Sequence, residues 1–176
     1  MNSVRNHNGF SLIELMIAMV LGLVIVLGTA SFYSTLKGTI LTANKLEIAQ
    51  ENLRSVYQLV ARSLHQADSV SATPQSLTVT YNNLQTGDVV LSCLGHSRGN
   101  GDQDVFTLQN NNVLCRDGNG AAQVIATHIA SMAVSTLGSY GVQLTLTPQD
   151  VPTSLSSGIT MQFALRQKYI KDKVTP

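Results

Sequence analysis

Tryptophan is absent from this chain of 176 residues, and aromatic residues make up only 5% of it. This scarcity argues against a platform on which sugars or nucleic-acid bases would stack. The chain also lacks a marked excess of either positive or negative side chains. One of the eleven basic residues, Arg5, lies in the first nine positions, so the rest of the chain balances ten basic against ten acidic side chains. A nucleic-acid groove needs a clustered basic face, so no nucleic-acid partner is expected.

Cysteine is scarce, with only Cys93 and Cys115 in the chain. A bond between them would close a loop of about 23 residues, worth roughly 3 kcal/mol if the benefit is chain entropy. Disulfides persist in oxidising compartments, and two free thiols are the alternative. A metal site with two cysteine ligands is the less favoured interpretation. The length of the chain favours one globular domain with a modest core.

Charged residues are missing from positions 15–36, although 44% of the whole chain is hydrophobic. About 20 apolar residues cross a bilayer as a helix, so this run predicts a membrane-spanning helix. A secretory signal peptide would have a shorter apolar region and a small-x-small cleavage site. Ala30 and Ser31 could supply that site, but Phe32 and Tyr33 follow directly and the helical pattern continues. An ordinary signal anchor is the other alternative.

A short motif precedes the apolar run and reads Gly9-Phe10-Ser11-Leu12-Ile13-Glu14-Leu15. A lone carboxylate costs about 2.5–3.5 kcal/mol at the centre of a membrane helix on insertion scales. Glu14 is therefore expected to have a partner that neutralises it. The alternative is an interfacial glutamate that stays among the lipid headgroups.

This motif resembles the prepilin signature of type IV pilins and type II secretion pseudopilins. The resemblance implies a leader of residues 1–9, which a prepilin peptidase removes between Gly9 and Phe10 on the cytoplasmic side, followed by methylation of the new amine of Phe10. Glu14 would pair with that amine or with a neighbouring subunit, setting the register of assembly. Major pilins often carry a proline in the membrane helix where this chain has Ser31, a departure that hints at a minor subunit.

The helical pattern continues beyond the apolar run, and no proline occurs before Pro74. Apolar residues recur every three or four positions, typical of one buried helix face: Leu46, Ala49, Leu53, Val56, Val60, Leu64 and Ala67. The pattern predicts one helix over residues 11–68, roughly 85–90 Å long. Residues 10–36 would form its transmembrane and assembly half, and residues 37–68 its amphipathic half.

The remainder, residues 69–176, has the short alternating runs of a β-rich domain. Strands are predicted near 77–81, 89–94, 142–146 and 159–165, and a hairpin over 105–115 turns at asparagines, which tolerate positive φ. Residues 123–132 suit a short helix or a strand, and a helix-like turn is preferred. The expected fold class is α+β, a pilin fold in which the long helix packs on an antiparallel β-sheet.

The sequences around the two cysteines resemble the PilW-like class of minor pilins; they read Cys93-Leu94-Gly95 and Asn112-Val113-Leu114-Cys115. The sequence of residues 9–28 resembles that class too. By that resemblance the domain is delivered to the periplasm, where a disulfide between Cys93 and Cys115 is expected rather than free thiols.

Two further groups of residues suggest chemistry. Asp102 and Asp104, with Asn100 and the loop 117–120, could offer oxygen ligands to Ca²⁺, although the spacing is not that of an EF-hand and two solvated turns are the preferred interpretation. His96 beside Ser97 and Asp102 could suggest a hydrolase, but no Gly-x-Ser-x-Gly elbow exists. No catalytic residues, no enzyme activity and no cofactor are therefore expected, apart from the weak calcium candidate.

The resemblance implies a minor pilin that primes or caps type IV pilus assembly. Its expected partners are other minor and major pilins, prepilin peptidase and the inner-membrane assembly platform. Its expected location is the inner membrane, crossed once, with the C-terminal domain in the periplasm and then in the pilus. The alternatives are a J-type tip pseudopilin of type II secretion, and a pilus-tip adhesin or DNA-uptake module.

Overall fold

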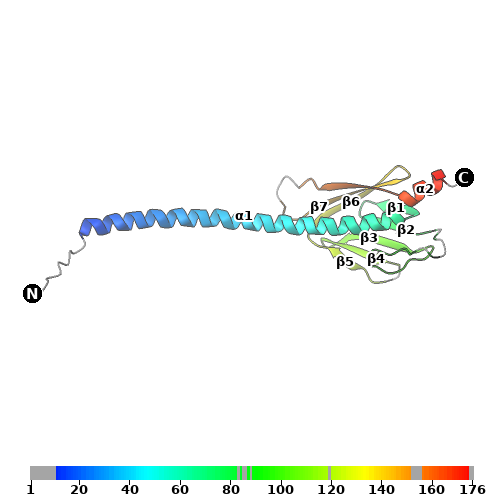
Figure 1. The fold of residues 1–176 in the computed structure, drawn as a ribbon, viewed down its shortest axis with the longest axis horizontal. Coiled ribbons are helices and arrows are strands. Elements are labelled where there is room, and N and C mark those ends of the chain that lie inside the picture. The colour runs from blue at the N-terminus through cyan, green and yellow to red at the C-terminus, as the bar shows by residue number, and fades with distance from the viewer. Residues whose placement is uncertain are drawn as a thin grey trace, which may run out of the picture. The chain divides into compact units, whose positions relative to one another are not determined.

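The structure is a computed structural model of the chain, and it describes residues 11–82, 84, 87, 89–118, 120–151 and 156–174. Its first element is the helix α1, Leu12–Gln66, of 55 residues (Figure 1). The carbonyl of Ser11 accepts hydrogen bonds from the amides of Glu14 and Leu15, at 3.0 and 3.2 Å, and so closes the first turn. The helix ends within two residues of the predicted boundary, which confirms the single long helix.

The chain divides into two compact units, the first ending at Ala43 and the second beginning at Asn44. In the first unit every described residue of α1 is exposed. Its threonine and serine hydroxyls donate to backbone carbonyls three or four residues earlier, as in the bond from Thr39 to Thr35 at 3.1 Å. These bonds satisfy polar side chains without partners from elsewhere, which suits an apolar surrounding.

The second unit contains two antiparallel sheets. The first has the order β1-β2-β3-β4-β5, with strands Ser69–Thr73, Ser76–Thr80, Gln103–Gln109, Asn112–Asp117 and Gln123–Ala126. The second has the order β6-β7-β8, with strands Ile129–Leu137, Gly141–Pro148 and Ile159–Ala164, and the helix α2, Arg166–Val174, follows. A long helix on antiparallel sheets confirms the α+β, pilin-like fold.

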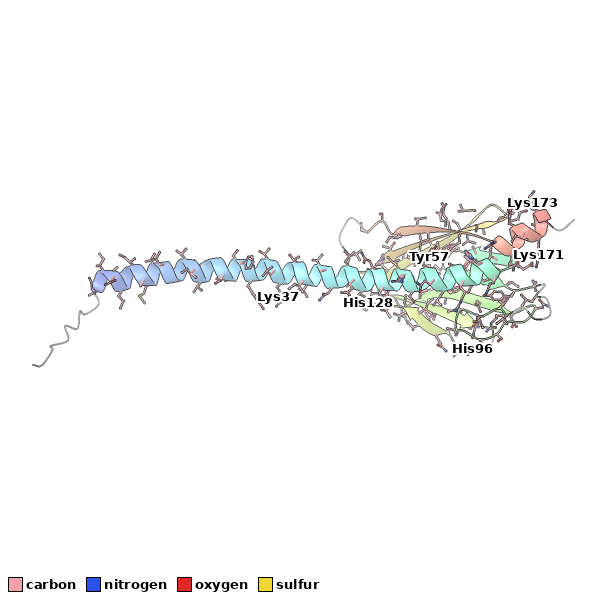
Figure 2. All side chains as sticks on the ribbon, in the orientation of Figure 1. Lys37, Tyr57, His96, His128, Lys171 and Lys173 are labelled. Atoms are coloured by element: carbon pink, nitrogen blue, oxygen red, sulfur yellow. A yellow bond between two sulfur atoms is a disulfide. The ribbon has the colours of Figure 1, made fainter. Side chains whose placement is uncertain are left out.

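The core of this unit lies between α1 and the inner faces of both sheets. The buried α1 residues follow the predicted stripe: Ala49, Leu53, Val56, Val60, Ser63 and Leu64. Tyr57, labelled in Figure 2, lies at the flank of this stripe and packs on Phe163 of β8, with ring centroids 5.3 Å apart. Alternation along β2 and β7 buries every second side chain, so the period-2 pattern positions these strands against the helix.

Two local predictions were wrong, and two elements were not predicted. Residues 123–132 form β5 and β6 instead of a helix-like turn, with His128 at φ 57° between them; pairing of β5 with β4 and of β6 with β7 outweighs the local helical spacing. Residues 89–94 form no strand, only a single bridge from Leu91 to Ser97. β1 and α2 were not predicted, because serine-rich and charged segments carry weak periodicity. The hairpin of β3 and β4 is confirmed, with Asn110 and Asn111 at positive φ.

Candidate functional site

The processing motif at the N-terminus is described only in part. Gly9 and Phe10, where cleavage and methylation are predicted, lie outside the described residues. Glu14 lies in the first turn of α1 and its side chain is exposed. A carboxylate in the first turn is favoured by the helix dipole. It therefore lies at the start of the apolar helix, available to a group outside this chain.

The disulfide joins a loop to the larger sheet. Cys93 lies in the segment of residues 89–102 between β2 and β3, hereafter the 89–102 segment, and Cys115 lies on β4. The two are bonded to each other, with their Cα atoms 6.5 Å apart, and both are buried. The predicted pair is therefore present, and it fastens a segment that has little regular secondary structure.

A cluster of buried charged residues surrounds this disulfide. Asp104 on β3 is fully buried, and its Oδ2 accepts three hydrogen bonds. The Tyr81 hydroxyl donates at 2.7 Å, the backbone amide of Cys93 at 2.7 Å and the Ser63 hydroxyl at 3.2 Å. One carboxylate oxygen thus connects α1, the end of β2, the 89–102 segment and β3. Burial of such a charge is tolerable only when it is well hydrogen-bonded and paired.

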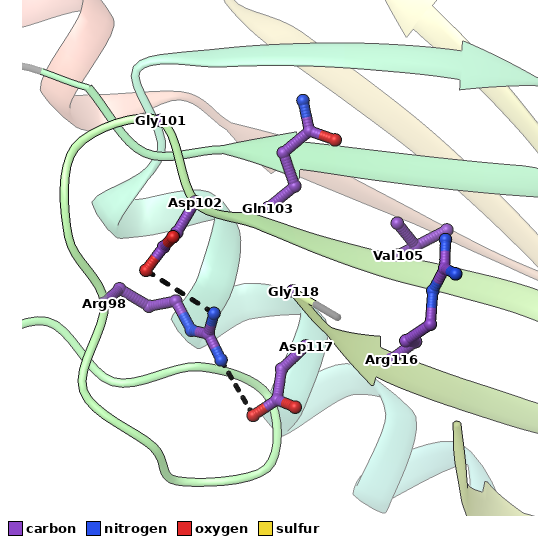
Figure 3. A pocket seen from close by; sticks show the side chains of 8 residues that line it. All are labelled: Arg98, Gly101, Asp102, Gln103, Val105, Arg116, Asp117 and Gly118. Carbon is purple, nitrogen blue, oxygen red and sulfur yellow. Dashed lines mark ion pairs between the residues drawn. The ribbon is translucent and has the colours of Figure 1, made fainter. Parts of the chain in front are cut away.

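The countercharge is Arg98 of the 89–102 segment, whose side chain is 8% exposed. Figure 3 shows its guanidinium between Asp102 and Asp117. Its Nη2 lies 2.8 Å from Oδ2 of Asp117, its Nη1 lies 3.6 Å from Asp102, and its Nε faces Oδ1 of Asp104 at 3.7 Å. A second arginine, Arg62 of α1, donates to the carbonyls of Ser92 and Cys93. Both arginines therefore hold the 89–102 segment against the core.

Two pKa values are displaced in this cluster. Burial raises the pKa of the Tyr81 hydroxyl well above its ordinary value, and the neighbouring Asp104 charge adds to the rise. Tyr81 is therefore a neutral donor at all physiological pH. Burial also acts to raise the pKa of Asp117, but hydrogen bonds from Ser92 and His96 and the charge of Arg98 outweigh it and lower that pKa. Asp117 is therefore ionised at neutral pH.

Ser92, His96 and Asp117 come together, but not as a nucleophile with its base. Asp117 is at the centre: its Oδ2 accepts from the Ser92 hydroxyl at 2.8 Å and lies 2.6 Å from Nδ1 of His96. Ser92 is fully buried, and its hydroxyl also accepts from the amides of Leu94 and His96. Nucleophilic catalysis needs a serine bonded to histidine and open to substrate. This arrangement instead fixes a turn.

The calcium candidates are placed beside Arg98. Asp102 has a side chain 43% exposed, and its Oδ2 accepts the amide of Gly99 at 2.8 Å. Within the part of the chain that the structure describes, no three histidine, cysteine, aspartate or glutamate side chains form a group able to hold a metal. Asn119 of the loop 117–120 lies outside that part. Calcium binding thus stays a prediction that the structure does not test.

A cavity of about 450 Å³ opens next to the cluster, lined by Arg98, Gly101, Asp102, Gln103, Val105, Arg116, Asp117 and Gly118 (Figure 3). Both arginine and aspartate side chains line it, and those of Arg98 and Asp117 are engaged with each other. Three of the charged residues at its wall, Arg98, Asp102 and Asp117, thus pair with one another, which is the pattern of a structural ion-pair cluster.

Sequence reasoning missed Tyr81, Arg98 and Asp117 as members of one cluster. A usable signal existed for the two aspartates, since Asp104 is in phase with the inward residue Phe106 and Asp117 with Cys115. An acidic residue at an inward position of a strand indicates a buried partner. No such signal marks Arg98, which lies outside the helices and strands.

Comparison with known families gives one match, at the N-terminus. The Prokaryotic N-terminal methylation motif matches residues 4–30, which include Gly9, Phe10, Glu14 and the first part of α1. No curated protein and no solved structure matches the chain. The match supports a type IV pilin or pseudopilin, a structural subunit rather than an enzyme.

The matched motif and α1 fit membrane anchoring and pilus assembly. In its most apolar 18 residues α1 has a mean hydropathy of 2.5, and it is long enough to cross a bilayer. A prepilin-type motif implies contact with other pilins and with prepilin peptidase.

Proposed function

We propose that this chain is a minor pilin that primes or caps a type IV pilus after prepilin peptidase removes its leader. The observation that carries the proposal is the methylation motif at residues 4–30, followed at Leu12 by a helix of 55 residues. The lack of a proline in the apolar half of that helix favours a minor over a major subunit.

In this mechanism cleavage between Gly9 and Phe10 creates a positive amine at the start of α1. Glu14 of a neighbouring subunit, or of the same chain, pairs with that amine in the helix bundle. An ion pair in a medium of low dielectric is strong when formed and costly when one partner is missing. The pair therefore selects one axial register between neighbouring helices.

Charge and redox chemistry support the proposed orientation, with the second unit in the periplasm. Arg5 precedes the apolar run, and positive residues are retained on the cytoplasmic side. The disulfide between Cys93 and Cys115 supports a periplasmic location for the second unit, because thiols stay reduced in the cytoplasm.

The test is to delete the gene in a strain whose pilus retraction is blocked, and to count surface pili while assaying secreted proteins. Loss of pili with secretion intact is the expected result. Normal pili with secreted proteins trapped in the periplasm would make the chain a type II secretion pseudopilin instead.

Glu14 is tested separately by complementing the deletion with Glu14→Ala. We expect the leader to be removed as in the wild type, since the cleavage site is unchanged, but pili to be lost. Glu14→Asp is the matched control and retains the charge one methylene shorter. Normal assembly of Glu14→Ala would contradict the pairing mechanism.

A further inference from the structure

Among the described residues, the two sheets of the second unit have four outer strands, β1, β5, β6 and β8. β1 and β6 lie against each other, and the amide of Val134 in β6 donates to the carbonyl of Pro74 at 3.3 Å. These two strands therefore meet where the sheets join. That leaves β5 and β8 as the free edges, and the chain treats them differently.

Side chains of α1 cap the edge beside β5. The Ser55 hydroxyl donates to the carbonyl of Ile125, and the amide of Thr127 donates to Oδ1 of Asn52, both at 3.1 Å. The pairing of β5 with β4 also shifts register between Val113 and Leu114. Capping and irregular register are two of the ways in which proteins stop an edge from pairing with another chain.

Among the described residues, neither capping nor a register shift is found at the edge formed by β8. Its six residues, Ile159–Ala164, include no charge, no proline and no glycine. Their register with β7 runs without a break from Gly141 opposite Ala164 to Leu146 opposite Ile159. In the described residues every hydrogen bond made by β8 goes to β7. The backbone groups on its outer side are therefore available to another strand.

The exposed face of β8 also carries an unfinished ladder of polar side chains. The hydroxyls of Thr160 and Thr145 lie 2.9 Å apart, and Nε2 of Gln162 donates to Oε1 of Gln143 at 3.2 Å. An amide has two donors and an acceptor of two lone pairs, so Gln162 can continue this row outward. The side chain that best continues a row of glutamines is another glutamine.

We propose that the outer edge of β8 pairs with β8 of a second copy of this chain, with Gln162 beside Gln162. In that antiparallel register the row of glutamine amides runs on across the two copies, and Thr160 of each copy lies opposite Ala164 of the other. Met161 and Phe163 stay on the inner faces, because alternate residues keep their side of a sheet. Two strands of this length bury less surface area than a standard interface of about 1,600 Å². The monomer and the dimer are therefore in reversible equilibrium, and the fraction of dimer rises with protein concentration.

Cross-linking of the full-length protein in detergent micelles, with the native disulfide intact, tests the contact. Gln162→Cys is expected to give a disulfide-linked dimer under mild oxidation. Ser135→Cys is the matched control, since Ser135, Gln143 and Gln162 form one row across the sheet and Ser135 lies on β6, at the opposite side of the sheet, where β6 meets β1. At least ten times more dimer from Gln162→Cys supports the proposal, and equal or absent dimer overturns it.

Sedimentation of the same full-length protein gives a second measurement that needs no new cysteine. The wild type is expected to pass from monomer to dimer with rising concentration. Gln162→Lys should weaken the dimer at least tenfold, because two lysines would then face each other at the edge. Ser135→Lys should leave it unchanged. A wild type that stays monomeric overturns the proposal, whether or not the chain assembles into pili.

Discussion

At the scale of single residues, Asp104 shows how one carboxylate can organise a segment without regular structure. Three donors from three parts of the chain converge on its Oδ2, and Arg98 faces its other oxygen. Removing it would leave these donors buried without an acceptor and Arg98 with less countercharge. The cost therefore includes the partners as well as the residue itself.

We expect Asp104→Ala to lower the free energy of unfolding by about 3–5 kcal/mol, the range for breaking a buried charge pair. Denaturant unfolding followed by tyrosine fluorescence measures it, because four of the five tyrosines follow Asn44 and report on the second unit. Asp102→Ala is the control: its side chain is 43% exposed, so its loss should cost less than about 1 kcal/mol. Equal losses would contradict the central position given to Asp104.

The lowered pKa of Asp117 predicts a dependence on acid. Because the folded-state pKa lies below the ordinary carboxyl value, the unfolded chain takes up this proton first as the pH falls. The stability that Asp117 contributes is complete above about pH 4 and is lost as the pH falls through the folded-state pKa.

We therefore expect Asp117→Asn to flatten the fall in unfolding free energy below pH 4, by up to about 1.4 kcal/mol per pH unit, the limit for one proton. Unfolding curves at pH 5, 4, 3 and 2.5 measure this slope. An unchanged slope in Asp117→Asn would mean that other carboxyls govern the acid response.

At the scale of elements, the disulfide rather than regular secondary structure holds the 89–102 segment in place. That segment holds Arg98 and Ser92 in place, yet it has only one isolated bridge of its own. Cys93→Ser with Cys115→Ser should lower the free energy of unfolding by roughly 3 kcal/mol. Hydrogen exchange should become faster in the double variant than in the wild type within residues 89–101, and should change less in β7. Equal acceleration in both regions would contradict a local role for the disulfide.

Most of the elements could be predicted from local pattern. α1 was predicted from missing proline and an apolar stripe, and the β3–β4 hairpin from its asparagines, because both signals depend on neighbours in the chain. β5 and β6 were misassigned because Val124, Ile125, Ile129 and Met132 also fit helical spacing. Only pairing with β4 and β7 decides between the two.

The candidate site divides in the same way. The prepilin motif and the cysteine pair could be predicted because their residue types and order are informative by themselves. The cluster of Tyr81, Arg98, Asp104 and Asp117 could not, because its members meet only after the sheet has formed. Its contacts join Ser63 to Asp104 and Ser92 to Asp117 across 41 and 25 positions, and no local period records them.

At the scale of the whole molecule, burial and membrane character belong to different parts of the chain. Among the described residues, the buried ones all lie at or beyond Ala49, while the apolar half of α1 is exposed. The core of the second unit therefore does not need the first unit. Its stability should be carried by the residues that follow the apolar run.

We expect a fragment beginning at Lys37 to leave the membrane fraction and to fold with its disulfide intact, with a melting temperature within about 5 °C of that of the second unit in the full chain. Fractionation, thiol titration and thermal unfolding measure these three properties. A fragment that aggregates or shows free thiols would mean that the apolar half also supports the fold.

The attachment of Arg62 and Ser63 has a mechanical consequence. In the proposed function the subunit is loaded through its helix, and that helix is bonded near its C-terminal end to the 89–102 segment by Arg62 and to β3 by Ser63. Tension entering along α1 is thus passed into a segment that a covalent bond fastens to β4. Sliding of the helix must break the bonds of both Arg62 and Ser63. In the proposed function the buried cluster therefore resists withdrawal of the helix from its domain when a fibre is pulled.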